Sequence, residues 1–144
     1  MLKLPVGIQT FSELREEGYV YVDKTKYIYE MVTKGKPYFL SRPRRFGKSL
    51  LVSTLKELFE GNKKLFKGLY IYDKWNWDEK YPVIALDFSG NKYKTLNDLK
   101  EKINDIINRK AREFQVEIYS KTIGEQFTDL ITGVYEKSGK EVVF

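Results

Sequence analysis

Residues 41–51 read SRPRRFGKSLL and contain the most specific chemical pattern in the chain. Gly47, Lys48 and Ser49 match the end of the pattern G-x-x-x-x-G-K-[ST]. In that pattern backbone N–H groups surround phosphates, the lysine reaches the terminal phosphates, and the hydroxyl coordinates Mg²⁺. A helix that begins at this point also directs its positive end and unpaired N–H groups at the anion. These residue types in this order predict a nucleotide phosphate site.

The first half of the same loop departs from the pattern. Arg42 stands where the first glycine is expected, and a residue with a Cβ cannot turn back as tightly as glycine. Pro43 removes one backbone donor, although its restricted φ can pre-organise the turn. Four positively charged residues lie within seven positions, namely Arg42, Arg44, Arg45 and Lys48. Because guanidinium groups bind phosphate oxygens through paired hydrogen bonds, charge can offset the lost backbone contacts.

The elements around the loop have the order that a phosphate site requires. Residues 37–41 form an aromatic and apolar run that predicts a short buried strand. From Lys48 the apolar residues follow a helical period until Gly61 ends the helix. Strand, loop and helix in this order favour a functional site. The opposing interpretation is a chance GKS tripeptide within a solvated or nucleic-acid-contacting basic run.

The rest of the chain alternates further apolar runs with helical patterns. Residues 19–22 are β-prone, and residues 82–90 form a continuous apolar run typical of a strand covered on both faces. A helix is predicted over residues 24–33, and two longer helices follow the capping residues Thr95 and Thr122. Strands separated by helices predict an α/β fold with a mostly parallel sheet.

The composition excludes several classes of chemistry. The chain has 144 residues, 42% hydrophobic and 32% charged, which is typical of one globular domain. It contains no cysteine and no histidine, which excludes disulfides, thiolate or imidazole metal sites and Ser-His-Asp triads within the chain. The remaining carboxylate, lysine, arginine and hydroxyl groups suit phosphate and Mg²⁺. The net charge of +6 favours a nucleotide or nucleic acid partner.

Targeting and membrane signals are missing from the sequence. No apolar run approaches the roughly 20 residues that a bilayer-spanning helix needs. The start, MLKLPVG, lacks the apolar stretch of a secretory signal. We therefore predict a cytoplasmic protein without a membrane partner.

Three stretches, SRPRRFGKSLL, GIQTFSELREEGYVYVDKT and YPVIALDFSG, together resemble the predicted AAA-ATPase-like family of prokaryotic proteins, over nearly the whole chain. The arginine in place of the first glycine is characteristic of that family. The resemblance implies a three-layer P-loop NTPase fold with ATP and Mg²⁺ as ligands. It also implies a longer complete protein, often with a C-terminal nuclease-like domain of the PD-(D/E)XK type, through which nucleic acid becomes a partner.

The resemblance assigns roles to residues of the loop. Lys48 is the predicted catalytic cation on the β and γ phosphates, and Ser49 is the predicted Mg²⁺ ligand. Arg44 and Arg45 are expected to bind phosphate or to hold the loop. The predicted nucleotide-binding residues are Arg44, Arg45, Phe46, Gly47, Lys48, Ser49 and Leu50. Residues 23–25, Asp-Lys-Thr, match a second family motif that is expected near the nucleotide; the alternative is that Asp23 only caps the helix.

The expected acids of the Walker B strand, which hold the magnesium shell and position water, would follow Phe144. We therefore expect residues 1–144 to be the N-terminal part of one P-loop domain, incomplete at its C-terminus, without the nuclease-like domain. Unpaired strand edges would then favour self-association. Asp87 offers a different catalytic carboxylate, since it ends an apolar run; its alternative role is to cap a turn.

Three functions share these observations. The leading hypothesis is an ATPase, in its complete form, that couples nucleotide binding or hydrolysis to an attached domain. The second is a non-hydrolysing basic module that binds nucleotide or nucleic acid phosphates. A third, a small-molecule phosphoryl transferase, lacks a recognisable acceptor pocket. Trp75 and Trp77 suit either a stacking platform for bases or a seal between a loop and the core.

Overall fold

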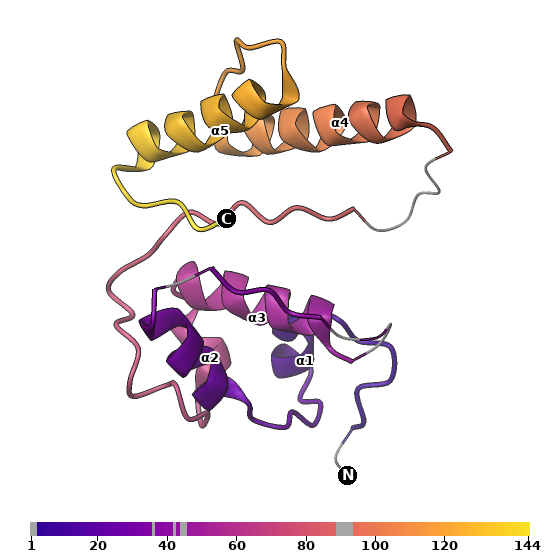
Figure 1. Ribbon diagram of the computed structural model, residues 1–144. Helices are drawn as coiled ribbons and strands as arrows, with labels where there is room; N and C mark the ends of the chain where they lie inside the picture. Colours follow the sequence, from indigo (N-terminus) through magenta and orange to yellow (C-terminus); the bar gives the residue numbers. More distant parts are fainter. Residues whose placement is uncertain (1–2, 36, 42, 44–45, 89–93) are drawn as a thin grey trace. The chain divides into compact units, whose positions relative to one another are not determined.

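A computed structural model describes residues 3–35, 37–41, 43, 46–88 and 94–144. The helices of the described residues are α1 (Phe11–Glu16), α2 (Thr25–Thr33), α3 (Lys48–Phe59), the 3-10 helix η1 (Lys63–Phe66), α4 (Leu96–Phe114) and α5 (Ile123–Ser138) (Figure 1). Contacts divide the chain into unit 1, Met1–Lys80, and unit 2, Tyr81–Phe144. The prediction that the chain is part of one P-loop domain stays a prediction.

The predicted three-layer α/β fold with a mostly parallel sheet is wrong. The structure is 50% helix and 3% strand, and its described residues form no sheet. Two isolated parallel bridges, Lys3 with Tyr19 and Val83 with Val143, are their β pairings. A helix forms its hydrogen bonds within its own segment, whereas a strand needs a second strand from elsewhere in the chain. The expected strands therefore remain extended segments without a ladder.

The segment before the phosphate loop illustrates this difference. Residues 37–41 form no β-bridge with any described residue, and the Phe39 side chain is 94% exposed instead of buried. In unit 2 the run at residues 82–88 makes one short pairing: Ile84 N–H donates to the Val143 carbonyl at 2.8 Å, and Val143 N–H donates to the Pro82 carbonyl at 3.0 Å. Self-association through such segments stays a prediction.

Unit 1 is built around an aromatic core. Phe66 is fully buried, and its ring centroid lies 4.8 Å from that of Phe11 and 5.1 Å from that of Trp77. The Trp77 indole N–H donates to the Tyr72 carbonyl at 2.7 Å, and Trp75 packs edge-on against Phe59. The two tryptophans thus fix the segment after η1 to the core, which is the sealing role considered from the sequence.

Unit 2 is a pair of helices with an apolar seam. Ile107 of α4 and Leu130 of α5 are fully buried in it. Thr95 forms a capping box with Asp98 at the start of α4, and Thr122 accepts the Glu125 N–H at the start of α5. Both predicted helix starts are confirmed. In the part of the chain that the structure describes, none of the helices has the length and apolar character needed to cross a bilayer.

Candidate functional site

The predicted phosphate loop ends in a left-handed glycine that starts α3. Gly47 has φ 76° and ψ 20°, a conformation that costs a residue with a Cβ about 1–2 kcal/mol. Its carbonyl accepts the first helical hydrogen bond, from Leu51 N–H at 2.9 Å. The glycine of the motif is therefore required by the backbone here. The predicted helix from Lys48 is confirmed, whereas residues 37–41 before the loop form no strand with the described residues.

The remaining loop residues divide into three groups. The Lys48 ammonium reaches back and donates to the Pro43 carbonyl at 2.8 Å. Ser49 is exposed on the first turn of α3, and Leu50 packs against the core of unit 1. Arg44 and Arg45, with Arg42, lie outside the described residues.

A groove of about 810 Å³ lies within unit 1 beside this helix start. Phe46, Gly47 and Leu50, three of the predicted binding residues, line it. Tyr21 and Tyr27 add two further aromatic rings to its wall. The remaining lining is mostly aliphatic, so the groove offers a carbon-rich surface next to the start of a helix.

One face of α2 and the residue before it form a wall of this groove. Lys24, Tyr27, Ile28 and Met31 line it and are spaced i, i+3, i+4 and i+7. Residues at these spacings share one helix face. Of these four residues only Lys24 belongs to a motif that was expected near the nucleotide, whereas Tyr27, Ile28 and Met31 had no predicted role, although their spacing is visible within the predicted helix. The spacing alone does not indicate which element this face meets.

The Asp-Lys-Thr motif is separated by the structure into two roles. The Asp23 carboxylate accepts Thr25 N–H at 2.8 Å and Thr25 Oγ1–H at 2.7 Å through one oxygen. Its other oxygen accepts Tyr70 N–H at 2.7 Å, and the Thr25 hydroxyl accepts Ile71 N–H at 3.2 Å. Asp23 lies before the N-cap Lys24, bonds to the first residue of α2 and ties this helix to a segment 47 residues further along. Lys24, between them, lines the groove.

The protonation of Asp23 reflects these bonds. Desolvation by itself raises the pKa of this carboxyl, but the hydrogen bonds from Thr25 and Tyr70 outweigh it. The net effect holds the Asp23 pKa below its usual value, because donors that point at a carboxylate favour its charged form. The carboxylate is thus kept ionised as a structural acceptor.

The described acidic residues do not cluster into a metal site. No group of three or more carboxylates that could hold a metal ion occurs in the described parts of the chain. Asp87, the predicted carboxylate, lies in unit 2 at the exposed end of the extended run, and its role stays a prediction. Mg²⁺ often takes only one or two protein ligands together with waters and substrate phosphates. The exposed Ser49 hydroxyl is compatible with that mode.

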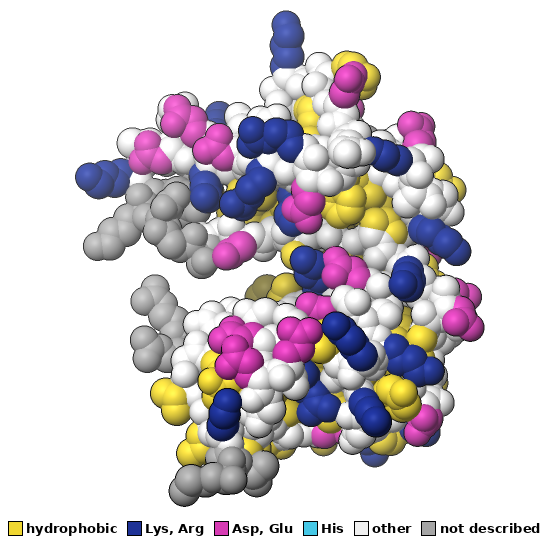
Figure 2. Space-filling view, turned by 180° about the vertical axis from the view of Figure 1, so that it is seen from behind, with side chains coloured by type: hydrophobic (Ala, Val, Ile, Leu, Met, Phe, Trp, Pro, Cys, Tyr) yellow, Lys and Arg dark blue, Asp and Glu magenta, His cyan; other side chains and the backbone are white. Residues whose placement is uncertain are grey.

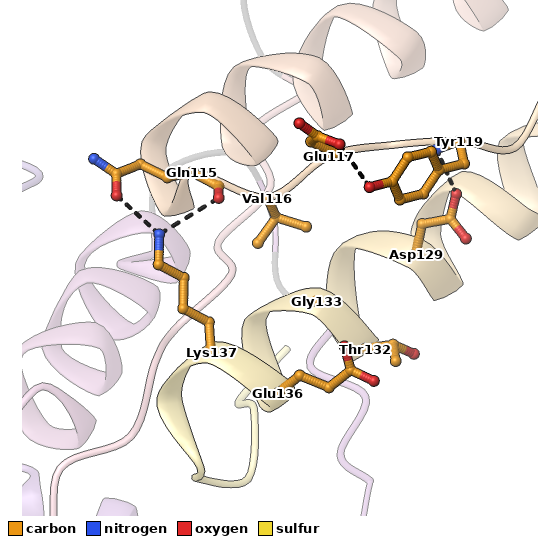
Figure 3. Close-up of a pocket in the computed structure, with 9 residues that line it drawn as sticks. All are labelled: Gln115, Val116, Glu117, Tyr119, Asp129, Thr132, Gly133, Glu136 and Lys137. Atoms are coloured by element: carbon orange, nitrogen blue, oxygen red, sulfur yellow. Dashed lines mark hydrogen bonds between the residues drawn. The ribbon is translucent and has the colours of Figure 1, made fainter.

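Unit 2 contains a second groove, of about 530 Å³, between the loop after α4 and α5 (Figure 3). Several of its polar groups are bonded to neighbouring parts of the chain. The Lys137 ammonium donates to the carbonyl and side-chain oxygens of Gln115, and the Tyr119 hydroxyl donates to Glu117. Asp129 accepts the N–H groups of Ser120 and Tyr119, which hold its pKa below the usual range. These bonds close a loop over a helix.

Comparison with known proteins covers nearly all of the chain. The pattern of the family described as "Predicted AAA-ATPase" matches residues 5–144. An "uncharacterized protein in vnfD 5'region" of Azotobacter chroococcum mcd 1 is 41% identical over 142 residues, which are 98% of this chain and 28% of that protein. The chain thus spans about a quarter of the length of this relative. No solved structure matches the present chain. The chain belongs to the predicted AAA-ATPase family.

Proposed function

We propose that unit 1 binds ATP with Mg²⁺ and that the complete protein is an ATPase that couples nucleotide binding or hydrolysis to an attached domain. The observation that carries this proposal is the position of Gly47. It begins α3 and also lines the apolar groove. A phosphate-binding helix start and a carbon-rich cavity are the two parts that a nucleotide requires, one for its anion and one for its base.

The phosphate half of the proposed site is the first turn of α3. This helix has 12 residues, and no side chain in the described part of the chain caps its start. Backbone N–H groups at an uncapped helix start favour an anion. Lys48, now bonded to the Pro43 carbonyl, would exchange that acceptor for a phosphate oxygen. Arg44 and Arg45 remain predicted contributors from the same loop.

The base half of the proposed site is the groove. Its volume of about 810 Å³ lies within the range of about 300–1,000 Å³ that is common for small-molecule sites. Tyr21, Tyr27 and Phe46 supply aromatic surface. Stacking of a base on such rings contributes about 1–3 kcal/mol. An adenine ring is therefore a suitable occupant.

The magnesium ion would be held by Ser49 and by the phosphates of the nucleotide. Bound Mg²⁺ neutralises charge on the β and γ phosphates during transfer. Hydrolysis also needs a carboxylate to orient water, supplied either by Asp87 or by a residue outside residues 1–144. We therefore propose hydrolysis for the complete protein, with nucleic acid as a partner of an attached nuclease-like domain.

The test is the substitution Lys48→Ala, with ATP binding measured by calorimetry in Mg²⁺. Loss of a charge-assisted contact to phosphate should weaken ATP binding about 10- to 100-fold. Lys56→Ala is the matched control, because Lys56 lies two turns further along α3 and pairs with Glu60 at 3.8 Å. Equal small losses in both variants would contradict a localised phosphate site.

The second candidate is a non-hydrolysing module that grips phosphates through diffuse charge. Unit 1 has 16 basic and 10 acidic residues, which gives it the whole net charge of the chain. On the face in Figure 2, however, basic and acidic side chains are interspersed. Diffuse binding would fall steeply with salt, would survive removal of Mg²⁺, and would not distinguish Lys48→Ala from Lys56→Ala.

A further inference from the structure

Lys24 is the one charged side chain among the described residues that line the groove of unit 1, and none of those residues is acidic. The described residues also form no ion pair with it. A carbon-rich cavity with a single cation favours a ligand that has an apolar body and a negative charge. The groove that Lys24 lines also contains Gly47, at the helix start of the proposed phosphate site.

We propose that Lys24 is a second phosphate-binding cation of the nucleotide site, a role that rests on the proposed nucleotide function. Lys48 approaches the ligand from the start of α3, and Lys24 approaches it from the residue before α2. The ammonium of Lys24 contacts phosphate oxygens, and its methylene stem covers apolar wall.

The residues on either side of Lys24 hold it in place. Asp23 and Thr25 are bonded to each other and to the backbone of Tyr70 and Ile71, at 2.7 Å and 3.2 Å respectively. Thr25 is fully buried. Because both neighbours are fixed to a distant segment, the backbone of Lys24 is positioned before any ligand arrives. A binding group that is held by such supporting bonds loses little entropy on binding.

Lys26 provides a matched comparison. It is an exposed lysine two positions further along, on α2, and it does not line the groove. A general effect of positive charge near the site would involve Lys26 and Lys24 alike. A specific contact would involve Lys24 alone.

The experiment measures dissociation constants of ATP and of adenosine for the unaltered chain, Lys24→Met, Lys24→Arg and Lys26→Met, with calorimetry in Mg²⁺. Methionine keeps an apolar stem of similar length and removes the charge. Lys24→Met should raise the dissociation constant of ATP about 10-fold and that of adenosine less than about twofold, because only ATP carries phosphates. Lys24→Arg should stay within about threefold for ATP, and Lys26→Met within about twofold. Circular dichroism melting of each variant confirms that it is folded.

Two results would overturn the proposal. Equal ATP losses in Lys24→Met and Lys26→Met would reduce the effect to diffuse charge. Equal losses of affinity for ATP and for adenosine in Lys24→Met would show that the Lys24 side chain contributes through apolar packing and not through its charge. Failure of the proposed function looks different: the unaltered chain would then not bind ATP at all, and the role of Lys24 would fall with it.

Discussion

Unit 1 and unit 2 each contain a groove, and the two grooves differ in what their polar groups already contact. In unit 2 the groove is lined by three carboxylates and one lysine, and Lys137, Asp129 and Glu117 are bonded to their own chain. In unit 1 the described lining of the groove is carbon-rich, with Lys24 as its one charged side chain and a helix start at its edge. The unit 2 groove thus has more polar groups, but several of them already bond to the chain. It is therefore the less promising ligand site.

The distribution of charge follows the same division. Unit 1 has 16 basic and 10 acidic residues, whereas unit 2 has 10 of each. The net charge of +6 is therefore located entirely in unit 1. Composition of the whole chain indicates an anionic partner, and division into units indicates which part would meet it. Both units have a groove, but a lining lysine whose ammonium forms neither an ion pair nor a hydrogen bond with the described residues is found in unit 1.

The largest expected effect separates the two cores. Phe66→Ala in unit 1 should cost about 3–5 kcal/mol of unfolding free energy, and Leu130→Ala in unit 2 about 2–5 kcal/mol, because each leaves a cavity at a fully buried position. Urea denaturation measures both. Below the melting range, Phe66→Ala should also weaken ATP binding, because the groove residues Ile28 and Leu50 pack on the same core.

Leu130→Ala should leave the ATP dissociation constant within about twofold, since it alters a separate cluster. The assignment of the nucleotide site to unit 1 alone is contradicted if Leu130→Ala weakens ATP binding as much as Phe66→Ala does. In that case unit 2 contributes to the nucleotide site.

An effect of intermediate size tests whether the unit 2 groove is closed by tight packing between Val116 and α5. A Cβ on Gly133 would overlap the Val116 side chain, so Gly133→Ala should destabilise the protein by about 1–3 kcal/mol. Gly124→Ala is the control on the same helix, because nothing lies within 4 Å of a Cβ there. Thermal melting of both variants distinguishes them. A neutral Gly133→Ala would indicate that Val116 does not seal this groove.

The smallest expected effect concerns the acid sensitivity of unit 1. The folded-state pKa of Asp23 is lowered, so this group adds stability at pH values above its unfolded pKa, which is about 3.9. That stability is lost as the pH falls through the lower, folded-state pKa. Asp23→Asn should therefore be less stable than the unaltered chain at pH 7, and the gap should narrow below about pH 4. Urea titrations at several pH values measure the difference in unfolding free energy between the two proteins. A difference that does not change with pH would contradict a stabilising role of the ionised Asp23 carboxylate.

The helical elements were predictable because their signals are local. The start of α3 at Lys48, the capping box at Thr95 and the cap at Thr122 all depend on residues within four positions of one another. The strands were not predictable in the same way. Residues 37–41 have the composition of a buried strand, but no ladder forms in the described residues, because a strand needs hydrogen bonds from a segment that its own sequence does not specify.

The candidate site shows the same limit. The sequence identified Gly47, Lys48 and Ser49 from spacing alone, and the positive φ of Gly47 gives that glycine a physical reason. The family resemblance led only to the expectation that residues 23–25 lie near the nucleotide; that Lys24 lines the same groove as Gly47, and that Asp23 bonds to Tyr70, follow from the structure. These relations join residues more than 20 positions apart in the sequence.

The sequence by itself determined where α3, α4 and α5 begin, the excluded chemistry and the prediction of a phosphate loop, because each depends on residue type and short-range spacing. Tertiary structure alone decided which face of α2 lines the groove with Gly47, which carboxylate bonds to a distant segment, and which groove contains a lysine whose ammonium forms neither an ion pair nor a hydrogen bond with the described residues. The physical reason is that burial and hydrogen-bond pairing are properties of contacts between distant segments, and those contacts exist only once the chain has folded.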